Sequence, residues 1–480
     1  MRSLLWFRGK DLRLSDHAAL GAALEGNEVI PLFVLDPYFF APGRAQELPH
    51  RMQCLLGALT ELEARIDGLG SRLLVVEGRS IEVVPRLART WKVDQVLAMR
   101  WSEPLGRCRD ALVSQALDVP FRRFEGETLL PPDTLHAASG RPYAVFTAFA
   151  RAFQRESSIG AALPAPLRLP PLPAGVRAET VAIPTLERLG LHPNAGLLQG
   201  GELAAQARLR AFLAGPAARY HLERDRLDLG TTSRLSADLH FGTLSVRTLW
   251  QEAGQVLSGS AAQALAGFRN ELLWREFAHS TLWDHPEMLR GPLRPGFRGF
   301  PWREDGAGWT AWTQGETGYP VVDAAARQLL AEGFVHNRAR MIAASFLVKD
   351  LLIDYRRGEA HYLKYLSDGD AAQNNAGWQW CLGSGFDAQP YFRIFNPVLQ
   401  GQKFDPTGAY VRRWVPELAP LPDKWIHRPW EAPLEVMKAA GLVRGRDYPD
   451  SIVGHAAARD RFLMEARSHF GGGTSYTEPA

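Results

Sequence analysis

Four short apolar runs punctuate the first third of the chain, and each has the length of a buried strand. They are "SLLWF" (3–7), "VIPLFVL" (29–35), "RLLVVEG" (72–78) and "QVLAM" (95–99). Stretches with helical spacing of apolar residues lie between and after them, at about 16–25, 46–67, 80–91 and 106–117. Strands that alternate with helices predict βαβ units and a doubly wound parallel sheet.

The first turn of this predicted sheet does not carry the glycine pattern of a dinucleotide site. It reads "FRGKDLRL", with no GxGxxG. A second glycine-containing stretch, "GLGSRL", lacks the third glycine and precedes a strand instead of following one. The pattern therefore indicates the fold without its usual NAD site.

The remainder of the chain changes character twice. Residues 131–200 are rich in proline, as in "LPAPLRLPPLPAGVRAETVAIP", and predict an extended linker that wraps a surface. From 201 to about 470 the apolar spacing is mostly helical. We expect an α/β domain at 1–130, a linker at 131–200, an all-α domain at 201–470 and a disordered tail at 471–480.

Composition narrows the class of protein only moderately. The 480 residues are 46% hydrophobic and 22% charged with a net charge of +3, which is compatible with a local cationic face for nucleic acid. Cys54, Cys108 and Cys381 are far apart and form no CxxC, so neither a disulfide framework nor a metal site is expected, and a reducing cytoplasm fits. No apolar run approaches the ~20 residues of a membrane span, and the N-terminus reads as a strand and not as a signal peptide.

The segment "DGDAAQNNAGWQW" (368–380) concentrates acids, amides and tryptophans. As a helix it would place Asp370, Asn374 and Trp378 on one face, with Ser367 and Asp370 as a capping box. Such a face does not suit an apolar core, because buried polar groups need hydrogen-bond partners. A bound polar heterocycle would supply these partners. The alternative is a capped surface helix with its tryptophans packed inward.

Three further segments carry candidate chemistry, each with an ordinary alternative. The hydroxyls of "GTTSRLSADLHFG" (230–242) precede a helix and suit phosphates, or form a simple cap. In "NELLWREFAH" (270–279), Trp274 offers a stacking platform for a base and Glu271 a hydrogen bond to a base edge; the alternative is a core tryptophan beside a surface pair of Glu271 and Arg275. In "HNRARMIAASFLVKDLL" (336–352), arginines at a helix end suit phosphates or form a solvated basic end.

Tryptophans are numerous, at 14 in the chain. Most tryptophans are core or interface residues. A chain of them between a redox cofactor and the surface would also pass an electron. The candidates for such a chain are Trp302, Trp309, Trp312, Trp378 and Trp380.

In this order, the segments resemble the DNA photolyase/cryptochrome family, and within it the class I cyclobutane pyrimidine dimer photolyases. The resemblance runs from "LLWFRGKDLRLSDHAAL" through "GRPYAVFTAFARAF", "GTTSRLS", "NELLWREF", "GYPVVDAAARQL" and "HNRARMIAASFLVKDLLID" to "DGDAAQNNAGWQW" and "PYFRIFNPVLQGQKFD". It implies an α/β domain able to hold an antenna pigment and a helical domain with FAD, active as FADH⁻. It also implies light-driven electron transfer to a pyrimidine dimer in DNA.

The resemblance assigns roles residue by residue. The positions similar to the FAD site are Tyr220, Thr232, Ser233, Arg234, Leu235, Ser236, Phe268, Arg340, Asp368, Gly369, Asp370 and Asn374, with Arg340 pairing Asp368 and Asn374 facing flavin N5. The positions similar to the dimer pocket are Glu271, Trp274, Asn337 and Met341. The positions expected to contact the DNA are Glu271, Trp274, Asn337, Arg224, Arg275, Arg338, Arg393, Gln400 and Lys403.

Three members of the family compete as models for the function. The first is the cyclobutane-dimer photolyase. The second, a (6-4) photolyase, is disfavoured because His336 is present but Met341 stands where a second histidine is expected. The third, a cryptochrome-type light sensor, is disfavoured by Asn374, where plant-type cryptochromes have Asp, and by a short C-terminal tail.

Two positions depart from the pattern. The electron path similar to that of the family is Trp378, Tyr355 and Trp302, with Tyr355 in place of the middle tryptophan, so we expect slower photoreduction or a route through Trp380. The acidic residue of folate-binding relatives is missing near Gly106, and their other folate contacts are unmatched at Met288 and Leu289. The antenna is therefore left open among folate, deazaflavin, another pigment and none. By resemblance we expect a cytoplasmic monomer that joins the nucleoid when bound to DNA.

Overall fold

The computed structural model describes residues 1–26, 28–177, 179–257, 259–387 and 392–471. These residues form two compact units. Unit 1 comprises residues 1–221, 232–286 and 367–372, and unit 2 comprises residues 222–231, 287–366 and 373–480. Most of the predicted tail, 472–480, lies outside the described residues. The domain boundaries expected from composition rest on a different criterion from these units, and they stay predictions.

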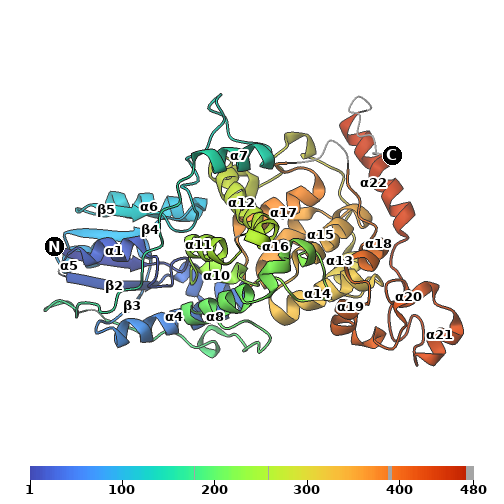
Figure 1. The fold of residues 1–480 in the computed structure, drawn as a ribbon, viewed down its shortest axis with the longest axis horizontal. Helices are drawn as coiled ribbons and strands as arrows, with labels where there is room; N and C mark the ends of the chain where they lie inside the picture. Colours follow the sequence, from blue (N-terminus) through green and yellow to red (C-terminus); the bar gives the residue numbers. More distant parts are fainter. Residues whose placement is uncertain (27, 178, 258, 388–391, 472–480) are drawn as a thin grey trace. The chain divides into compact units, whose positions relative to one another are not determined.

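Unit 1 contains a five-stranded parallel sheet in the order β3-β2-β1-β4-β5 (Figure 1). The strands are β1 (Arg2–Phe7), β2 (Glu28–Leu35), β3 (Leu74–Glu77), β4 (Gln95–Met99) and β5 (Phe121–Phe124). The first four confirm the strands expected from the apolar runs. β5 was missed, because its sequence "FRRF" is polar in the middle and the strand lies at the partly exposed edge of the sheet.

Helices cover both faces of this sheet, which explains the uninterrupted apolar runs. The helices around it are α1 (Ala18–Leu24), α2 (Pro37–Phe40), α3 (Pro42–Gln46), α4 (Pro49–Gly68), α5 (Ser80–Thr90) and α6 (Pro104–Ala116). Side chains alternate along each strand, so Leu5 and Phe7 pack with α1 and α4, whereas Leu4 and Trp6 pack with α5 and α6. The doubly wound α/β fold is therefore confirmed.

The expected linker is extended over most of its length, but it is not free chain. Its described residues contain one α-helix, α7 (Phe146–Glu156), and a 3₁₀ turn, Glu187–Leu189. Its backbone also bonds to the α/β layer: Leu169 N–H donates to the Leu69 carbonyl at the end of α4, and Val181 N–H donates to the Val75 carbonyl of β3. The later helices of unit 1 are α8 (Glu202–Leu213), α10 (Ser236–Phe241), α11 (Val246–Val256) and α12 (Ala262–Asp284). A short helix, α9 (Tyr220–Glu223), lies at the unit boundary.

Unit 2 is built of helices joined by loops, as expected, and its described residues contain no named strand. Its helices are α13 (Gly306–Gln314), α14 (Pro320–Glu332), α15 (Asn337–Ser345), α16 (Tyr355–Tyr365), α17 (Ala371–Leu382, which begins in unit 1), α18 (Pro397–Phe404), α19 (Ala409–Trp414), α20 (Asp423–Ile426), α21 (Leu434–Ala439) and α22 (His455–Phe470). A π-helical turn, Phe346–Asp350, continues α15. One large core contains apolar side chains of most of these helices, among them Val322, Leu347 and Phe462.

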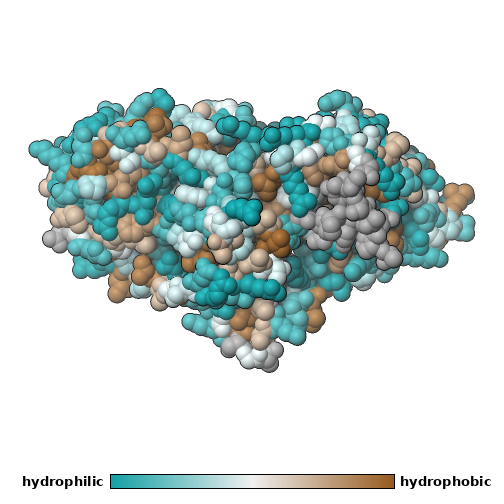
Figure 2. Space-filling view, turned by 90° about the horizontal axis from the view of Figure 1, so that it is seen from above, coloured by the Kyte–Doolittle hydropathy of each residue, from teal (hydrophilic) through white to brown (hydrophobic). Residues whose placement is uncertain are grey.

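The surface carries mixed side chains. On the face drawn in Figure 2, hydrophobic residues occur in small groups between hydrophilic ones. Among the described residues, no helix is both long enough and apolar enough to cross a membrane.

Candidate functional site

Asp370 lies just before α17 and not within it. The helix begins at Ala371, and the backbone N–H of Asp370 donates to the carbonyl of Asp368 at 2.6 Å, so the segment is a turn. The predicted capping box of Ser367 and Asp370 is therefore wrong, because Ser367 lies four residues before the helix. Asn374 and Trp378 are both in α17 and, four residues apart, share a face as expected.

The turn at 367–370 ends in a buried ionic cluster of unit 1. Lys10 follows β1, and its Nζ lies 2.7 Å from Glu103 Oε1, 2.6 Å from Glu127 Oε1 and 3.7 Å from Asp370 Oδ2. The neighbouring residue Gly369 offers its carbonyl to Arg51 Nη1 at 3.0 Å, and a Cβ at Gly369 would lie 3.1 Å from Arg51 Nε. Segments far apart in the sequence therefore hold this turn in place.

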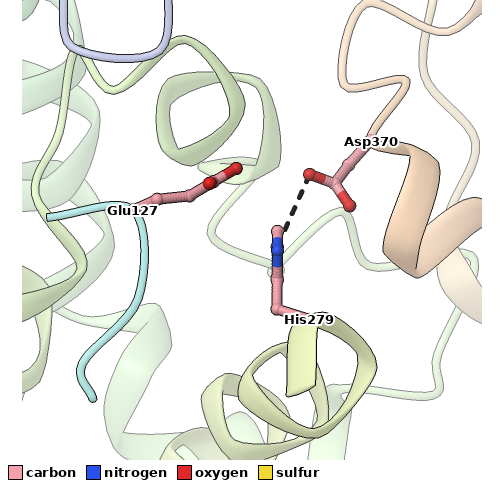
Figure 3. A group of neighbouring side chains, drawn as sticks. All are labelled: Glu127, His279 and Asp370. Atoms are coloured by element: carbon pink, nitrogen blue, oxygen red, sulfur yellow. Dashed lines mark ion pairs between the residues drawn. The ribbon is translucent and has the colours of Figure 1, made fainter. Parts of the chain in front are cut away.

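Two histidines face the same carboxylate. The Nε2 atom of His279 lies 3.5 Å from Asp370 Oδ2, and the Nδ1 atom of His240 lies 3.9 Å from it. Figure 3 shows Asp370, His279 of α12 and Glu127 pointing toward one another. The Oγ of Ser102 lies 2.7 Å from His279 Nδ1, which fits a tautomer with the proton on Nε2, facing Asp370. Ser102 is 3% exposed, so this Ser–His–Asp order is a structural chain and not a hydrolytic triad.

Charges in the cluster are fixed by Lys10. Burial opposes the ionised forms, but the surrounding carboxylates raise the pKa of Lys10, and Lys10 holds the pKa of Glu127 at about 2. Burial also works against the Asp370 carboxylate, yet His279, Lys10 and His240 hold its pKa well below the usual range. Because burial lowers the pKa of both His240 and His279, the imidazoles are neutral at pH 7 and Lys10 supplies positive charge at Asp370.

The same geometry resembles a three-ligand metal site. Glu127, His279 and Asp370 each bring one ligand atom within 4.8 Å of the others. The ammonium of Lys10 already pairs with both carboxylates. We therefore assign the cluster as an ionic network around a lysine.

The residues expected at the FAD phosphates lie in a turn that suits them. Thr232, Ser233 and Ser236 are partly exposed, and none of their hydroxyls bonds to another described residue. Arg234 has a positive φ of 53° and precedes Leu235 at φ −88°, a pairing of left- and right-handed residues that turns successive N–H groups to one side. Hydroxyls and N–H groups of this kind fit a diphosphate.

Aromatic packing joins two other expected cofactor positions, Tyr220 and Phe268, in the same unit. The ring of Phe268 lies 5.2 Å from that of Tyr220, edge to face, and 5.1 Å from that of Phe212. Phe268 is buried and Tyr220 is partly exposed. Phe268 thus fills the expected aromatic position as part of a packed cluster.

Helix α12 brings Glu271 and Trp274 to a partly exposed stripe. They lie three residues apart, and residues 275–282 that follow are all buried. Phe146 of α7 stacks on Trp274 with ring centroids 3.8 Å apart and an interplanar angle of 5°. One face of the indole is therefore held by a neighbouring ring.

Arg275 corrects one expectation. It was expected to contact DNA, but it is 4% exposed. Its Nη1 donates to the Glu127 carbonyl at 2.6 Å and lies 3.7 Å from Glu276. The prediction is wrong, because the helix turns this side chain into the unit 1 core.

Helix α15 presents the other expected pocket residues. Asn337 is exposed and its Nδ2 lies 3.7 Å from the Sδ of Met341, one turn later. His336 caps the helix by accepting from the Arg338 N–H at 3.1 Å. Burial lowers the pKa of His336 to about 4, so this imidazole is a neutral acceptor at pH 7.

Most of the expected DNA-contacting cations belong to unit 2. The guanidinium of Arg338 and the ammonium of Lys403 lie 4.4 Å and 5.2 Å from the centre of the Phe404 ring, so α15 and α18 bring them together. Arg338 also pairs with Asp225 at 2.9 Å. Arg393 is exposed, and Arg224 and Gln400 are partly exposed.

The position of Arg340 is partly defined. Its Nε donates to the Val335 carbonyl at 2.7 Å, and its guanidinium lies 5.7 Å from the Phe334 ring. The predicted pair of Arg340 with Asp368 stays a prediction.

The amide of Asn374 is oriented by its own unit. Its Nδ2 donates to the Glu359 carbonyl at 3.0 Å, and that of Asn375 donates to the Glu359 carboxylate at 2.9 Å. Burial raises the pKa of Glu359 to about 7. A carboxyl group with a pKa near neutral pH therefore lies beside the amides of Asn374 and Asn375.

A run of ring contacts leads from Trp378 to a partly exposed tryptophan. The Trp378 ring lies 6.0 Å from Trp312, and Trp312 lies 5.6 Å from Trp309. Trp378 and Trp312 are buried, whereas Trp309 is partly exposed. Gly358 permits this packing, because a Cβ there would lie 2.2 Å from the Trp378 Cη2 atom.

The expected middle step, Tyr355, is placed differently. Among the described residues, no ring contact joins Tyr355 to Trp378 or Trp302, and none joins Trp380 to Trp378. Tyr355 is buried, its hydroxyl has no hydrogen-bond partner in the described part of the chain, and burial raises its pKa well above the ordinary value. The roles expected of Tyr355, Trp302 and Trp380 stay predictions.

Sequence reasoning did not single out Lys10 or Glu127. The available signal for Lys10 was its place directly after the first strand, where open α/β sheets bind ligands. Glu127 gave no comparable signal, because it follows the strand that was missed. Trp309 and Trp312 were among the noted tryptophans but were given no place in the path.

Known proteins give the context for this geometry. Residues 3–171 match the family model described as "DNA photolyase", and residues 268–468 match the one described as "FAD binding domain of DNA photolyase". A deoxyribodipyrimidine photo-lyase of Agrobacterium fabrum is 39% identical over 96% of this chain and 96% of its own.

Two solved structures share the whole fold. A bacterial class III photolyase from Agrobacterium tumefaciens has a TM-score of 0.91 and 38% identity, covering 98% of this chain and 97% of its own. A cryptochrome from Synechocystis has a TM-score of 0.89 and 30% identity, covering 96% and 98%. The matched domain identifies FAD as the cofactor, and the chain belongs to the DNA photolyase family.

Proposed function

We propose that this protein repairs cyclobutane pyrimidine dimers in DNA, using light and its bound FAD. The observation that carries the proposal is the partly exposed stripe of α12. There, a carboxylic acid, Glu271, and an aromatic face, Trp274, lie one turn apart on a helix whose following residues are buried. A partly exposed pair of this kind suits a base-like ligand better than it suits a core.

The pocket chemistry follows from these side chains. Trp274, steadied by Phe146, stacks on one ring of the dimer, a contact worth about 1–3 kcal/mol per base. With its carboxyl group protonated, Glu271 would donate a hydrogen bond at the pyrimidine edge and so stabilise the negative charge that develops there. In unit 2, the Asn337 amide and the Met341 thioether of α15 lie beside each other, and their expected role in binding the dimer stays a prediction.

Cations of unit 2 hold the strand. Arg338, Arg393 and Lys403 bind phosphates, so affinity falls as salt rises. A dimer is poorly stacked, so extruding it costs less than extruding a normal base.

Bound FAD in its reduced form would supply the light-driven electron transfer that opens the cyclobutane ring, with no net redox change. The chain's own task is to orient the cofactor. Thr232, Ser233 and Ser236 offer hydroxyls to its phosphates, and Asn374 presents an amide that Glu359 fixes by its carbonyl. An amide neither gains nor loses a proton near neutral pH, so Asn374 favours the anionic reduced flavin.

Two alternatives are less well supported. A (6-4) photolyase requires an acid near the lesion, and His336 is neutral at pH 7 and is used as a helix cap. A light sensor of the cryptochrome type shares the fold, and the test below separates it from repair.

The test is light-dependent dimer loss. The purified protein, with its flavin reduced, is given a single-stranded oligonucleotide that contains one cyclobutane thymine dimer, in blue light and in darkness. Loss in light alone supports the proposal. No loss, with FAD bound and still photoreducible, contradicts it and assigns the protein to the sensors.

Variants of the pocket sharpen the test. We expect Glu271→Ala and Trp274→Ala each to lower repair at least tenfold. Trp250→Ala is the matched control, because Trp250 is also partly exposed and in contact with a phenylalanine of α7, Phe153. An equal loss in the control would contradict a specific role for Trp274.

A further inference from the structure

The carboxyl ends of β1 and β4 form the point where the strand order of the sheet reverses. Open α/β sheets bind their ligands in the crevice at this point. Here β1 leads to Lys10, and β4 leads to Ser102 and Glu103. At this point Asp370, from the chain's own turn at 367–370, lies 3.7 Å from the Lys10 ammonium.

Lys10 is costly to bury and has many partners. Its side chain is 6% exposed, and three carboxylates surround its Nζ. Glu103 and Glu127 come from the same unit as the sheet, and Glu127 also accepts from the Ser102 N–H at 2.7 Å. The third carboxylate, Asp370, comes from a segment more than 350 residues later in the chain.

The neighbouring Arg8 shows what a purely structural ion pair looks like in this loop. Its side chain is fully buried and pairs with Asp110 of α6. None of its contacts with described residues reaches 367–370. Arg8 and Lys10 are two residues apart, yet Arg8 pairs with helix α6 whereas Lys10 pairs with the turn at 367–370.

We infer that Lys10 is a positioning residue for the cofactor: through Asp370 it holds the 368–370 turn in the shape that binds FAD. The inference rests on the proposed assignment of Asp368, Gly369 and Asp370 to the FAD site. His279 and His240 also lie next to the Asp370 carboxylate, and Arg51 donates a hydrogen bond to the Gly369 carbonyl. Lys10 itself need not touch the cofactor.

The test measures FAD release from the intact holoprotein. FAD fluorescence reports release after dilution, at a temperature where the far-UV circular dichroism of each variant matches that of the parent. We expect Lys10→Gln to release FAD at least tenfold faster than the parent. Arg8→Gln, the matched control, is expected to stay within threefold.

A double-mutant cycle separates positioning from general loosening. If Lys10 acts through Asp370, Lys10→Gln changes release less than twofold in an Asp370→Asn background. If Lys10→Gln alone fails to fold, the double variant, which has lost one charge of each sign, is compared directly with Asp370→Asn, and equal release rates are expected.

Two results would overturn the inference. One is release from Lys10→Gln within twofold of the parent. The other is an equal factor for Lys10→Gln in both backgrounds. A parent protein that holds no FAD would contradict the proposed function itself, and the parent sample alone reveals that case.

Discussion

The two halves of "DGDAAQNNAGWQW" show two ways of burying polar and aromatic side chains. The first half, through Ala372, belongs to unit 1, where Asp370 is enclosed by charged and polar groups. The second half belongs to unit 2, where Trp378 is enclosed by rings. Thirteen consecutive residues therefore serve opposite kinds of chemistry.

The difference teaches how strictly each half depends on its neighbours. A buried carboxylate needs compensating charge within a few ångströms, so the loss of one partner leaves an unpaired charge. A buried indole needs only close packing, and another ring can replace much of it. The ionic half is expected to fail abruptly on substitution, and the aromatic half gradually.

The largest effect is expected from Lys10→Met. It leaves Glu127 and Asp370 buried without their cation, which costs about 3–5 kcal/mol of unfolding free energy. Trp378→Phe, in the aromatic half, is expected to cost about 1–2 kcal/mol. Urea unfolding of both variants measures the contrast, and equal losses would remove it.

A smaller effect is expected on photoreduction. Phenylalanine is much harder to oxidise than tryptophan, so Trp312→Phe should slow flavin photoreduction about tenfold, which corresponds to about 1.4 kcal/mol in the barrier. Tyr355→Phe should change it less than twofold, because the buried hydroxyl has no described acceptor for its proton. Flavin absorbance under blue light with an external reductant follows both.

Trp302→Phe is the control for this route. It should also leave the rate nearly unchanged. A greater loss in Tyr355→Phe or Trp302→Phe than in Trp312→Phe would restore the path expected from the sequence.

The smallest effect is a dependence of stability on pH at Glu359. Its pKa rises from 4.5 in the unfolded chain to about 7 in the folded protein, so folding favours the protonated acid. This contribution is fully present below about pH 4.5 and is lost as pH rises through about 7. Because the side chain is partly exposed, we expect about 1 kcal/mol. Glu359→Gln should remove this part of the difference in unfolding free energy between pH 5 and pH 8; an unchanged difference would exclude Glu359.

The sequence predicted the sheet well where strands are apolar along their whole length. β1 and β2 are covered on both faces, so their composition alone marks them. β5 escaped because an edge strand has no such requirement. The capping box failed because the turn at 368–370 is set by Arg51 and Lys10, which no local pattern reveals.

The sequence singled out candidate site residues where local chemistry was unusual. Glu271 and Trp274 stand out within one helical turn, and their roles stay predictions. Arg275, next to them, was misassigned, because the direction of a side chain depends on what the helix packs against. The pairing of Lys10 with Asp370 joins distant segments and could not be read from spacing.

The proline-rich segment between the sheet and the later helices has a consequence for aggregation. β3 is an edge strand, and the Val181 N–H covers the carbonyl of Val75 on that edge. Prolines cannot continue a hydrogen-bonded ladder, so the segment closes the edge at single points without offering a new one. A protease cut in this segment would expose the β3 edge, where the backbone of another chain can pair with it. The segment therefore protects the protein against self-association as well as connecting its parts.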